Sequence, residues 1–278
     1  MRLQRIHEAI NFKPWFITAE GFSSIKSIFD KHFESKNSLV NVDNSQEMLE
    51  DTMGDFVNSR PEMMVDKEDI AHIYICGVLG QKLTAFEKAC GNTGYEQITM
   101  DIDAALSEGA KGILFYGDTP GGMAVGIHEV ATKIASLEIP TALYTDSLLC
   151  SAGYYLGCSV DYIVASSDAM VGSIGTILPW VDQSKLWEIR GLSFDAITNT
   201  GADLKDSMHG PTLGVNHREF LQEFVDDLAD QFHGHVSEMR ELDDEVWRAG
   251  FYVGMRALDY NLVDDIGGAN LAREYLLQ

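Results

Sequence analysis

The chain has little positive charge. Its 278 residues include 20 lysines and arginines against 43 aspartates and glutamates, which gives a formal net charge of −23 at pH 7. Proteins that bind nucleic acid through a general basic surface need lysine and arginine for phosphate contacts. We therefore expect no nucleic-acid partner. The acidity favours solubility, and it also suits a basic partner or assembly inside a charged particle.

Long apolar runs and paired cysteines are missing as well. No run of about 18 apolar residues occurs, so the sequence predicts no transmembrane helix. The N-terminus has no continuous apolar region of the kind found in signal peptides. These features favour a cytoplasmic protein without a membrane anchor.

The cysteines show no C-x-x-C pair and no zinc spacing, which predicts free buried thiols in a reducing compartment. They are Cys76, Cys90, Cys150 and Cys158. His233 and His235 lie in an acidic helical stretch and read as a solvated face rather than a metal site. We accordingly expect no metal and no cofactor.

The sequence does contain a regular alternation of short β-branched runs and amphipathic stretches, which begins at Ile70. Repeated strand-then-helix units with short loops predict an α/β fold with a mainly parallel sheet. The expected strands are 70–78, 112–116, 141–144 and 162–165, and the expected helices are 98–108, 127–137, 150–158, 185–190 and 218–240.

The residues before this alternation have a different character. Residues 1–38 carry phenylalanine and isoleucine at helical spacing, which predicts short amphipathic helices. Residues 39–68 are polar and acidic, which is typical of a linker. We therefore divide the chain into a helical N-terminal segment with an acidic linker, residues 1–68, and a main domain, residues 69–278.

Short motifs follow one another in the main domain. They are a turn at Pro120-Gly121-Gly122, then Ser151-Ala152-Gly153, then Gly172-Ser173-Ile174-Gly175, and the single lysine Lys205. A serine attacks a carbonyl only where a base removes its proton and N–H donors hold the oxyanion. Together the motifs can supply these parts. Each motif is common by itself, whereas the ordered set is much harder to obtain by chance.

Ser151 is the expected nucleophile. It lies at a strand-to-helix junction, where Ala152 and Gly153 permit a close backbone approach. The N-terminus of the helix offers free N–H groups to a forming anion. Without the other motifs, the same serine would be an ordinary helix N-cap. The side chain of Cys150 is expected to point away, because neighbours on a tight turn diverge.

Lys205 is the expected general base, because burial can lower the pKa of a lysine toward neutrality. Only Lys185 and Lys205 follow Ser151, and Lys185 lies in what reads as a solvated helix face. A solvated loop lysine is the simpler interpretation of Lys205. A Ser–His–Asp triad also stays open, with His209 as the candidate histidine.

From about Ile70 to Gly268 the ordered motifs resemble the S49 serine peptidases, the signal peptide peptidase A group of the Clp protease/crotonase superfamily. The matching stretches are 70–80, 116–122, 150–155, 171–176, 201–206 and 247–254. The resemblance implies a core of repeated β-β-α units arranged as a superhelix. It also implies a serine endopeptidase with a Ser–Lys dyad that needs no cofactor.

The same resemblance assigns roles to individual residues. It implies an oxyanion hole made by the amide of Gly121 or Gly122 together with the amide of Ala152, and it suggests that Ser173 orients the lysine amine. It further implies a homo-oligomer. A helical stripe of four-residue spacing is either a subunit contact or core, and the sequence leaves both open. The stripe consists of Phe220, Phe224, Leu228 and Phe232.

The biological role has several candidates. An S49 chain with a helical N-terminal segment is similar to the tailed-phage head-maturation peptidases, which trim capsid and scaffold proteins, and residues 12–20 are similar to their leading segment. The alternatives are a stand-alone cytoplasmic protease like the signal peptide peptidases, a non-catalytic capsid assembly protein, and a crotonase-type acyl-CoA enzyme. The acyl-CoA enzyme would not need Ser151 and Lys205 together.

Overall fold

The computed structural model describes residues 15–17, 60–206 and 210–278. The helices expected within residues 1–38 and the candidate His209 lie outside the described residues. Two short strands of the predicted N-terminal unit, β1 (Trp15–Ile17) and β2 (Met64–Val65), pair with strands of the main domain. The division of the chain at residue 68 stays a prediction.

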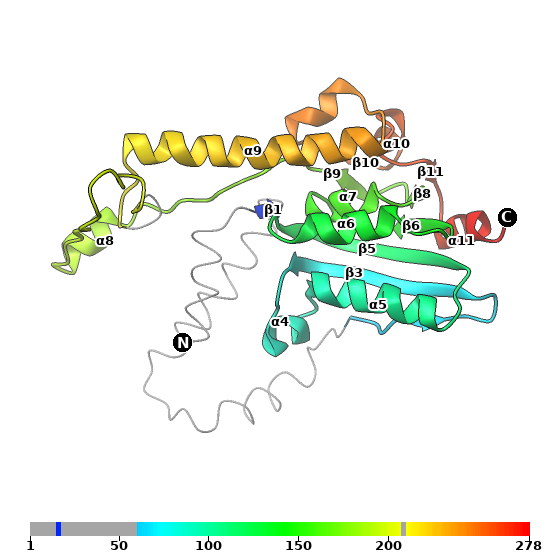
Figure 1. Cartoon of the computed structure of the whole chain (residues 1–278). Coiled ribbons are helices and arrows are strands. Elements are labelled where there is room, and N and C mark those ends of the chain that lie inside the picture. Colours follow the sequence, from blue (N-terminus) through cyan, green and yellow to red (C-terminus); the bar gives the residue numbers. More distant parts are fainter. Residues whose placement is uncertain (1–14, 18–59, 207–209) are drawn as a thin grey trace.

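A long strand, β5 (Gly112–Met123), organises the sheet (Figure 1). One of its edges pairs in parallel with β3 (Ile70–Gly80) from end to end. Its other edge is shared by β6 (Thr141–Thr145), which pairs near the start of β5, and β7 (Leu148–Cys150), which pairs further along. Because β6 and β7 use different parts of β5, the sheet divides into two branches there.

Each branch continues with one strand of the next unit. β8 (Tyr162–Ala165) pairs in parallel with β6, and β9 (Met170–Gly172) pairs in parallel with β7. The chain therefore runs through β6, β7 and the short helix α7 (Ala152–Gly157), and then through β8 and β9. The branches end at β11 (Asp265–Ile266) and β10 (Phe251–Val253). This confirms the predicted α/β fold with mainly parallel strands.

Helices cover both faces of the sheet. Successive residues of a strand point to opposite faces, so β5 contributes apolar side chains to a cluster on each side. In β5, Leu114 packs in a small cluster under α11 (Ala269–Leu276), whereas its neighbours Ile113 and Phe115 belong to the main core. The remaining helices and strands are α4 (Ala85–Ala89), β4 (Thr93–Gly94), α5 (Tyr95–Ser107), α6 (Ile127–Ala135), the 3-10 helix η2 (Asp244–Arg248) and α10 (Gly254–Asp259).

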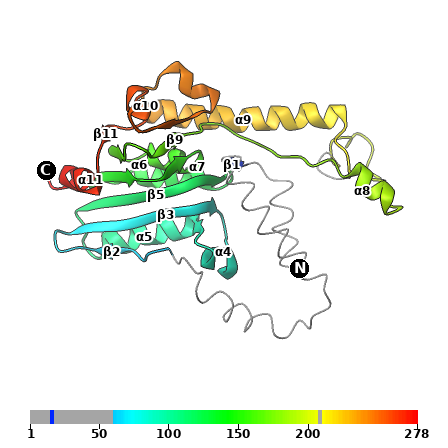
Figure 2. The same cartoon turned by 180° about the vertical axis from the view of Figure 1, so that it is seen from behind.

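After β9 the chain leaves the sheet. It runs out to α8 (Ser184–Ile189) and returns along α9 (Val215–Met239), a helix of 25 residues whose far half packs on the body of the fold (Figures 1 and 2). We call residues 176–226 the arm. Large apolar side chains of the arm are exposed, namely Ile177, Val181, Leu186, Ile189, Leu192, Phe194, Ile197, Leu204, Val215, Phe220 and Phe224.

The predicted turn at Pro120–Gly122 is wrong, because β5 continues through these residues to Met123. Glycine is required here by close approach rather than by a turn. A Cβ on Gly122 would lie 2.0 Å from the carbonyl oxygen of Leu79 in β3, a distance at which the backbone would have to shift. The glycines therefore let neighbouring strands pack against this part of β5.

Candidate active site

Two of the predicted site residues, Ser151 and Ser173, directly follow the ends of neighbouring strands. Thr119 of β5 pairs with Leu149 of β7, so Ser151 follows a strand that lies beside β5 just before its glycine motif. Cys150 pairs with Gly172 of β9, so the next residues, Ser151 and Ser173, are level. The structure thus places Ser151 and Ser173 side by side where β7 and β9 end, and β7 lies next to β5.

The backbone of Ser151 is strained. Its φ of 53° and ψ of −115° lie outside the regions that non-glycine residues usually occupy, which costs about 1–3 kcal/mol. The surroundings hold this conformation, because the Ser151 N–H donates to the Gly172 carbonyl at 2.7 Å and the Tyr155 N–H donates to the Ser151 carbonyl at 2.9 Å. Ser173 also has a positive φ, 56°, and its N–H donates to the Gly250 carbonyl at 2.7 Å.

The hydroxyl of Ser151 is buried and unsatisfied. The residue is 1% exposed, and its Oγ has no hydrogen-bond partner within residues 15–17, 60–206 and 210–278. Leaving a buried polar group unpaired costs about 1–3 kcal/mol. Strain and an unpaired hydroxyl at the same residue are typical of a functional site rather than of a helix cap. The side chain makes no N-cap hydrogen bond to α7.

Helix α7 begins directly after Ser151 and packs closely on β5. Ala152 is the first residue of α7, where N–H groups have no partner inside the helix. A Cβ on Gly153 would lie 2.3 Å from Cγ2 of Thr119, so glycine is needed for α7 to approach β5. The Gly121 N–H donates to Oγ1 of Thr119 at 3.1 Å, and that hydroxyl donates to the Gly77 carbonyl at 2.6 Å.

The sequence analysis missed Thr119. Its hydroxyl connects the glycine motif of β5 to the Gly77 carbonyl of β3, and its methyl group sets how closely α7 approaches. The sequence indicates a role for Thr119 only weakly, because a threonine before Pro120 is typical of the ordinary end of a β-branched strand. Only the pairing of β5 with β3 and β7 shows that this side chain lies at the site.

The thiol next to the serine is not a competing nucleophile. Cys150 is buried, and its Sγ lies 3.5 Å from the carbonyl oxygen of Met170. Desolvation raises the pKa of this thiol to about 12. Because only the thiolate is nucleophilic, Cys150 is inert at neutral pH. Its side chain points toward β9, as expected for a neighbour of Ser151 that diverges from it.

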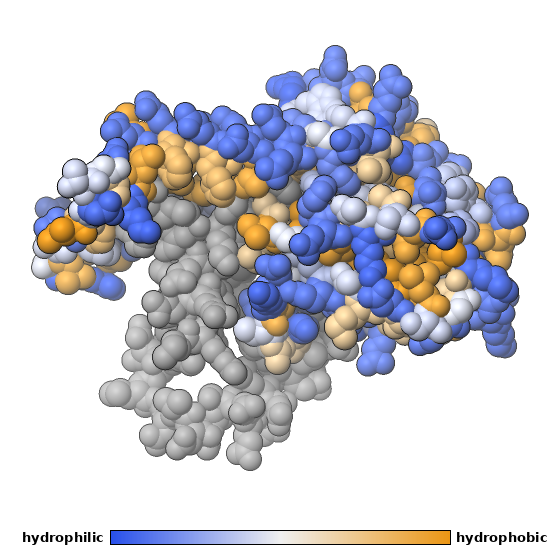
Figure 3. Space-filling view, viewed as in Figure 1, coloured by the Kyte–Doolittle hydropathy of each residue, from blue (hydrophilic) through white to orange (hydrophobic). Residues whose placement is uncertain are grey.

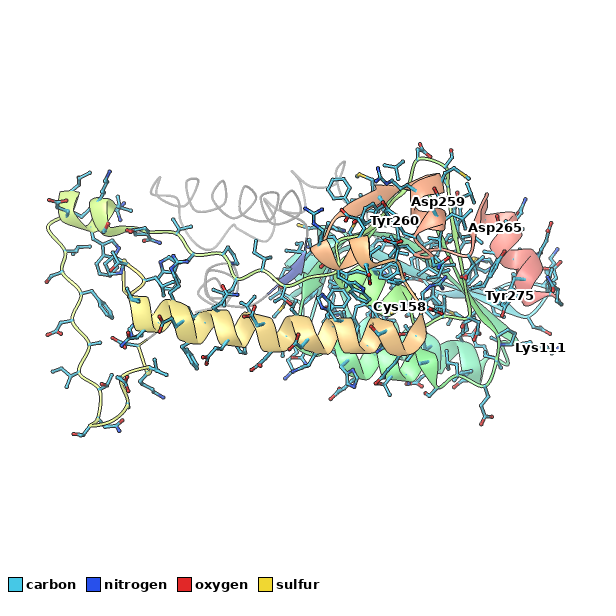
Figure 4. The ribbon with its side chains drawn as sticks, turned by 90° about the horizontal axis from the view of Figure 1, so that it is seen from above. Lys111, Cys158, Asp259, Tyr260, Asp265 and Tyr275 are labelled. Carbon is cyan, nitrogen blue, oxygen red and sulfur yellow. The ribbon has the colours of Figure 1, made fainter. Side chains whose placement is uncertain are left out.

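Lys205 lies in the arm, and its backbone N–H donates to the carbonyl of Ala202 at 3.1 Å. The residue is exposed. The next residue, Asp206, contacts His217 near the start of α9, with 3.3 Å between carboxylate oxygen and Nε2. The segment that carries Lys205 is therefore fixed to the N-terminal end of α9, away from the body of the fold (Figure 4).

Ser151 lies near the opposite, C-terminal half of α9. Tyr155, one turn after Ser151, packs on Phe232 of α9 with ring centres 5.0 Å apart. His217 and Phe232 are separated along α9 by about 22 Å, at 1.5 Å per residue. In Figure 4, Cys158 at the end of α7 lies beside the end of α9 that is remote from the arm. Within one chain, the structure does not bring Lys205 to Ser151.

The expectation of a solvated face is wrong for His235, because the C-terminal half of α9 packs on α7. His235 is buried, and its Nε2 lies 3.0 Å from Oγ of Ser159 and 3.2 Å from the carbonyl oxygen of Tyr155. Desolvation lowers the pKa of His235. His233 packs beside Trp247. In the described ranges, no cluster of His, Cys, Asp and Glu side chains could hold a metal ion.

The sequence of the chain matches the model of a peptidase family. The model of Peptidase family S49 covers residues 133–277, which include Ser151, Ser173 and Lys205. This is more than half of the chain, and the chain belongs to peptidase family S49.

Several curated proteins are similar in sequence to this chain. The chain is 35% identical over 56% of its length to the putative signal peptide peptidase SppA of Enterococcus faecium. It is 29% identical over 71% of its length to the capsid assembly protease C of Escherichia phage lambda. It spans 47% and 46% of the lengths of these two relatives. The head-tail preconnector protein GP5 of Enterobacteria phage P21 is 24% identical over 72% of this chain, which spans 41% of that protein.

Solved structures to which the chain shows similarity include the 1510-N membrane-bound stomatin-specific protease and an enoyl-CoA hydratase from Mycobacterium marinum. The protease is 16% identical, with a TM-score of 0.35 over 70% of this chain and 74% of its own. The hydratase is 15% identical, with a TM-score of 0.43 over 78% of this chain and 85% of its own. Across the residues that the structure describes, no helix is long and apolar enough to cross a bilayer.

Proposed function

We propose that this chain is a serine endopeptidase in which Ser151 is the nucleophile and Lys205 of a second copy is the general base. One observation carries the proposal: the buried Ser151 hydroxyl has no partner among the described residues, and a strained backbone holds it beside the glycines of β5. Such a hydroxyl becomes a nucleophile when a base reaches it.

The arm supports the participation of a second copy. Lys205 is exposed and lies on the order of 20 Å from Ser151 along α9, which is beyond the reach of a lysine side chain. The apolar stripe of α9 changes character along the helix. Phe232 is fully buried, whereas Phe220 and Phe224 are 39% and 36% exposed. Figure 3 shows apolar side chains along this half of α9 and at α8.

Exposed apolar surface of this extent is typical of a protein contact. We propose that the arm packs on a neighbouring copy, so that the predicted homo-oligomer forms through this contact. A head-to-tail contact of this kind repeats around a ring and gives every Ser151 the Lys205 of its neighbour. The contact would also bury the lysine, and burial lowers the pKa of an amine toward neutrality.

The chemistry follows from these positions. The neutral amine of Lys205 takes the proton of the Ser151 hydroxyl as Oγ attacks the peptide carbonyl. The amides of Ala152 and of Gly121 or Gly122 hold the oxyanion, and each such donor lowers the barrier by about 3 kcal/mol. The ammonium then protonates the leaving amine. Water hydrolyses the acyl-enzyme in a second step, with the same lysine as base. Ser173, level with Ser151, would orient the amine.

The substrate class follows from the relatives. Two of them carry names of phage capsid assembly, the protease C of phage lambda and GP5 of phage P21. We therefore propose capsid or scaffold proteins as the substrates, inside the assembling head or the host cytoplasm. The SppA relative supports the alternative of a general cytoplasmic peptidase.

Replacement of Ser151 tests the proposed chemistry. Ser151→Ala should abolish cleavage of casein, a loss of at least about 1,000-fold, because the covalent route is removed. Cys150→Ala is the matched control at the adjacent buried position, and it should keep most of the activity. Full activity of Ser151→Ala, or loss of activity in Cys150→Ala with an unchanged melting temperature, would contradict the proposal.

The substrate proposal has its own test. Capsid and scaffold proteins encoded by the same genome should be cut at defined positions by the wild-type protein and left intact by Ser151→Ala. Cleavage of casein with intact capsid and scaffold proteins would favour the general peptidase instead. If both variants support assembly equally, the chain is an assembly protein rather than a protease.

A further inference from the structure

The short strand β1 pairs with the glycine motif of β5. The two strands are antiparallel, with Trp15 opposite Met123, Phe16 opposite Gly122 and Ile17 opposite Gly121. The other edge of these β5 residues is already taken by β3, which pairs in parallel with Gly121 and Gly122. β1 therefore fills the one edge that β3 leaves open.

This edge is the one from which the nucleophile approaches. β7 pairs with β5 at Thr119 and carries Ser151 at its end. At Ser151 the chain turns away into α7, so β7 does not follow β5 as far as Gly121. β1 takes up the edge at that point. Ile17 is opposite Gly121, two β5 residues beyond Thr119, where the pairing with β7 ends.

A peptide that is to be cut must lie in the same place. Its scissile carbonyl has to reach the serine and the glycine amides together, and an extended peptide binds a free strand edge through its backbone, whatever its sequence. β1 already pairs through its backbone with these glycines. Its Ile17 side chain is 5% exposed, so the segment is anchored by burial as well as by pairing. Two strands cannot occupy one edge.

We infer that β1 is an internal occupant of the peptide-binding edge, which competes with substrate and lowers the activity of the protein while the strand is paired. The inference rests on the proposed function, because it takes Ser151 as the nucleophile. The occupant is a segment of this chain, residues Trp15–Ile17, and an extended substrate competes with it. Activity is thereby coupled to whatever removes the N-terminal strand from β5.

Substitutions at Ile17 test the inference in the full chain. Ile17→Asp places a carboxylate at a buried position and should release the strand. Labelling of Ser151 by a fluorophosphonate should then be roughly tenfold faster, equivalent to about 1.4 kcal/mol. Ile17→Val keeps an apolar side chain and should label within about twofold of the wild type. Ile17→Ala should accelerate labelling less than Ile17→Asp, and it decides the matter if the aspartate variant does not fold.

Hydrogen exchange supplies a second readout that does not depend on catalysis. Amides of residues 121–123 should exchange faster in Ile17→Asp than in the wild type, and a synthetic peptide with the sequence of residues 12–20 should restore both slow exchange and slow labelling. Faster exchange with unchanged labelling of Ser151 would make β1 a structural strand and overturn the inference while leaving the proposed function intact.

Two further outcomes are decisive. Failure to label Ser151 in every variant would refute the proposed function itself, and the inference with it. Cleavage of the wild-type chain between residues 15 and 18, absent in Ser151→Ala, would make the segment a substrate and overturn its role as an inhibitor. Faster labelling that the added peptide reverses is the result that the inference predicts.

Discussion

Subunits that carry only Ser151→Ala and subunits that carry only Lys205→Ala should complement one another when they are mixed. Each variant alone lacks one half of the dyad in every site. The structure ties the Lys205 segment to His217 and the Ser151 segment to Phe232, about 22 Å apart along α9, so in the proposed dyad the halves meet between chains. A mixed ring contains sites with an intact serine from one subunit and an intact lysine from the next.

The expected recovery of activity follows from the fraction of sites that combine both intact residues. In a random one-to-one mixture, about one site in four combines both intact residues, so the mixture should recover about a quarter of the wild-type activity. A dyad within one chain would recover none. The reverse mixture separates the models too. Wild type mixed with the Ser151→Ala/Lys205→Ala double variant should keep about a quarter of the activity for a dyad between chains and about half for a dyad within a chain.

The assay is peptide cleavage after dissociation and reassembly of the mixed subunits. Wild-type protein taken through the same cycle controls for losses. Recovery of activity is then compared with each variant treated alone. A mixture that stays inactive, although the wild type survives the cycle and the mixed subunits co-assemble, would refute the reasoning that the arm of one copy completes the site of another.

Other predictions concern the arm, the buried histidine and the glycine contact. Phe224→Asp should shift sedimentation toward monomer and lower activity by at least about tenfold. Met100→Asp, at an exposed apolar residue of α5 outside the arm, should change neither. The pKa of His235 is lowered in the folded protein, so just below its ordinary pKa of 6.5 the unfolded chain binds more protons than the folded one. The free energy of unfolding in urea should therefore fall as pH drops through that value, and His235→Gln should make this dependence on pH less steep. An unchanged pH dependence in the variant would show that another group causes the acid sensitivity. Gly122→Ala should destabilise the fold by about 3 kcal/mol, because its Cβ meets the backbone of β3. Gly234→Ala, in α9 with nothing near the added Cβ, should stabilise it by about 1 kcal/mol in the same unfolding assay; equal effects would contradict the close approach.

The longer elements of this fold could be predicted because their patterns are unambiguous. The β-branched runs at 70–78 and 112–116 are strands that start at the predicted residues and end two and seven residues beyond the predicted ends. β7 and β9, of three residues each, escaped prediction because so short a run shows no periodicity. These two strands place Ser151 and Ser173 beside each other, so the sequence motifs identified the residues without showing the geometry that joins them.

Two parts of the site depend on contacts that local sequence does not encode. The glycines after Pro120 favour a turn locally, yet pairing with β3 on one edge and β1 on the other keeps them in a strand. The stripe of α9 has the same spacing whether it is core or contact surface. The structure divides it, because Phe232 packs on the fold and Phe224 lies beyond its edge in the arm. The S49 motifs predicted the family, which the match over residues 133–277 confirms.

The central claim is that a lysine amine activates the Ser151 hydroxyl. Labelling with a fluorophosphonate, followed by mapping of the modified residue by mass spectrometry, tests it most directly. The label should fall on Ser151 in the wild type and in Lys185→Ala, and should be lost at neutral pH in Lys205→Ala. A label on another residue, or normal labelling of Ser151 without Lys205, would contradict the account.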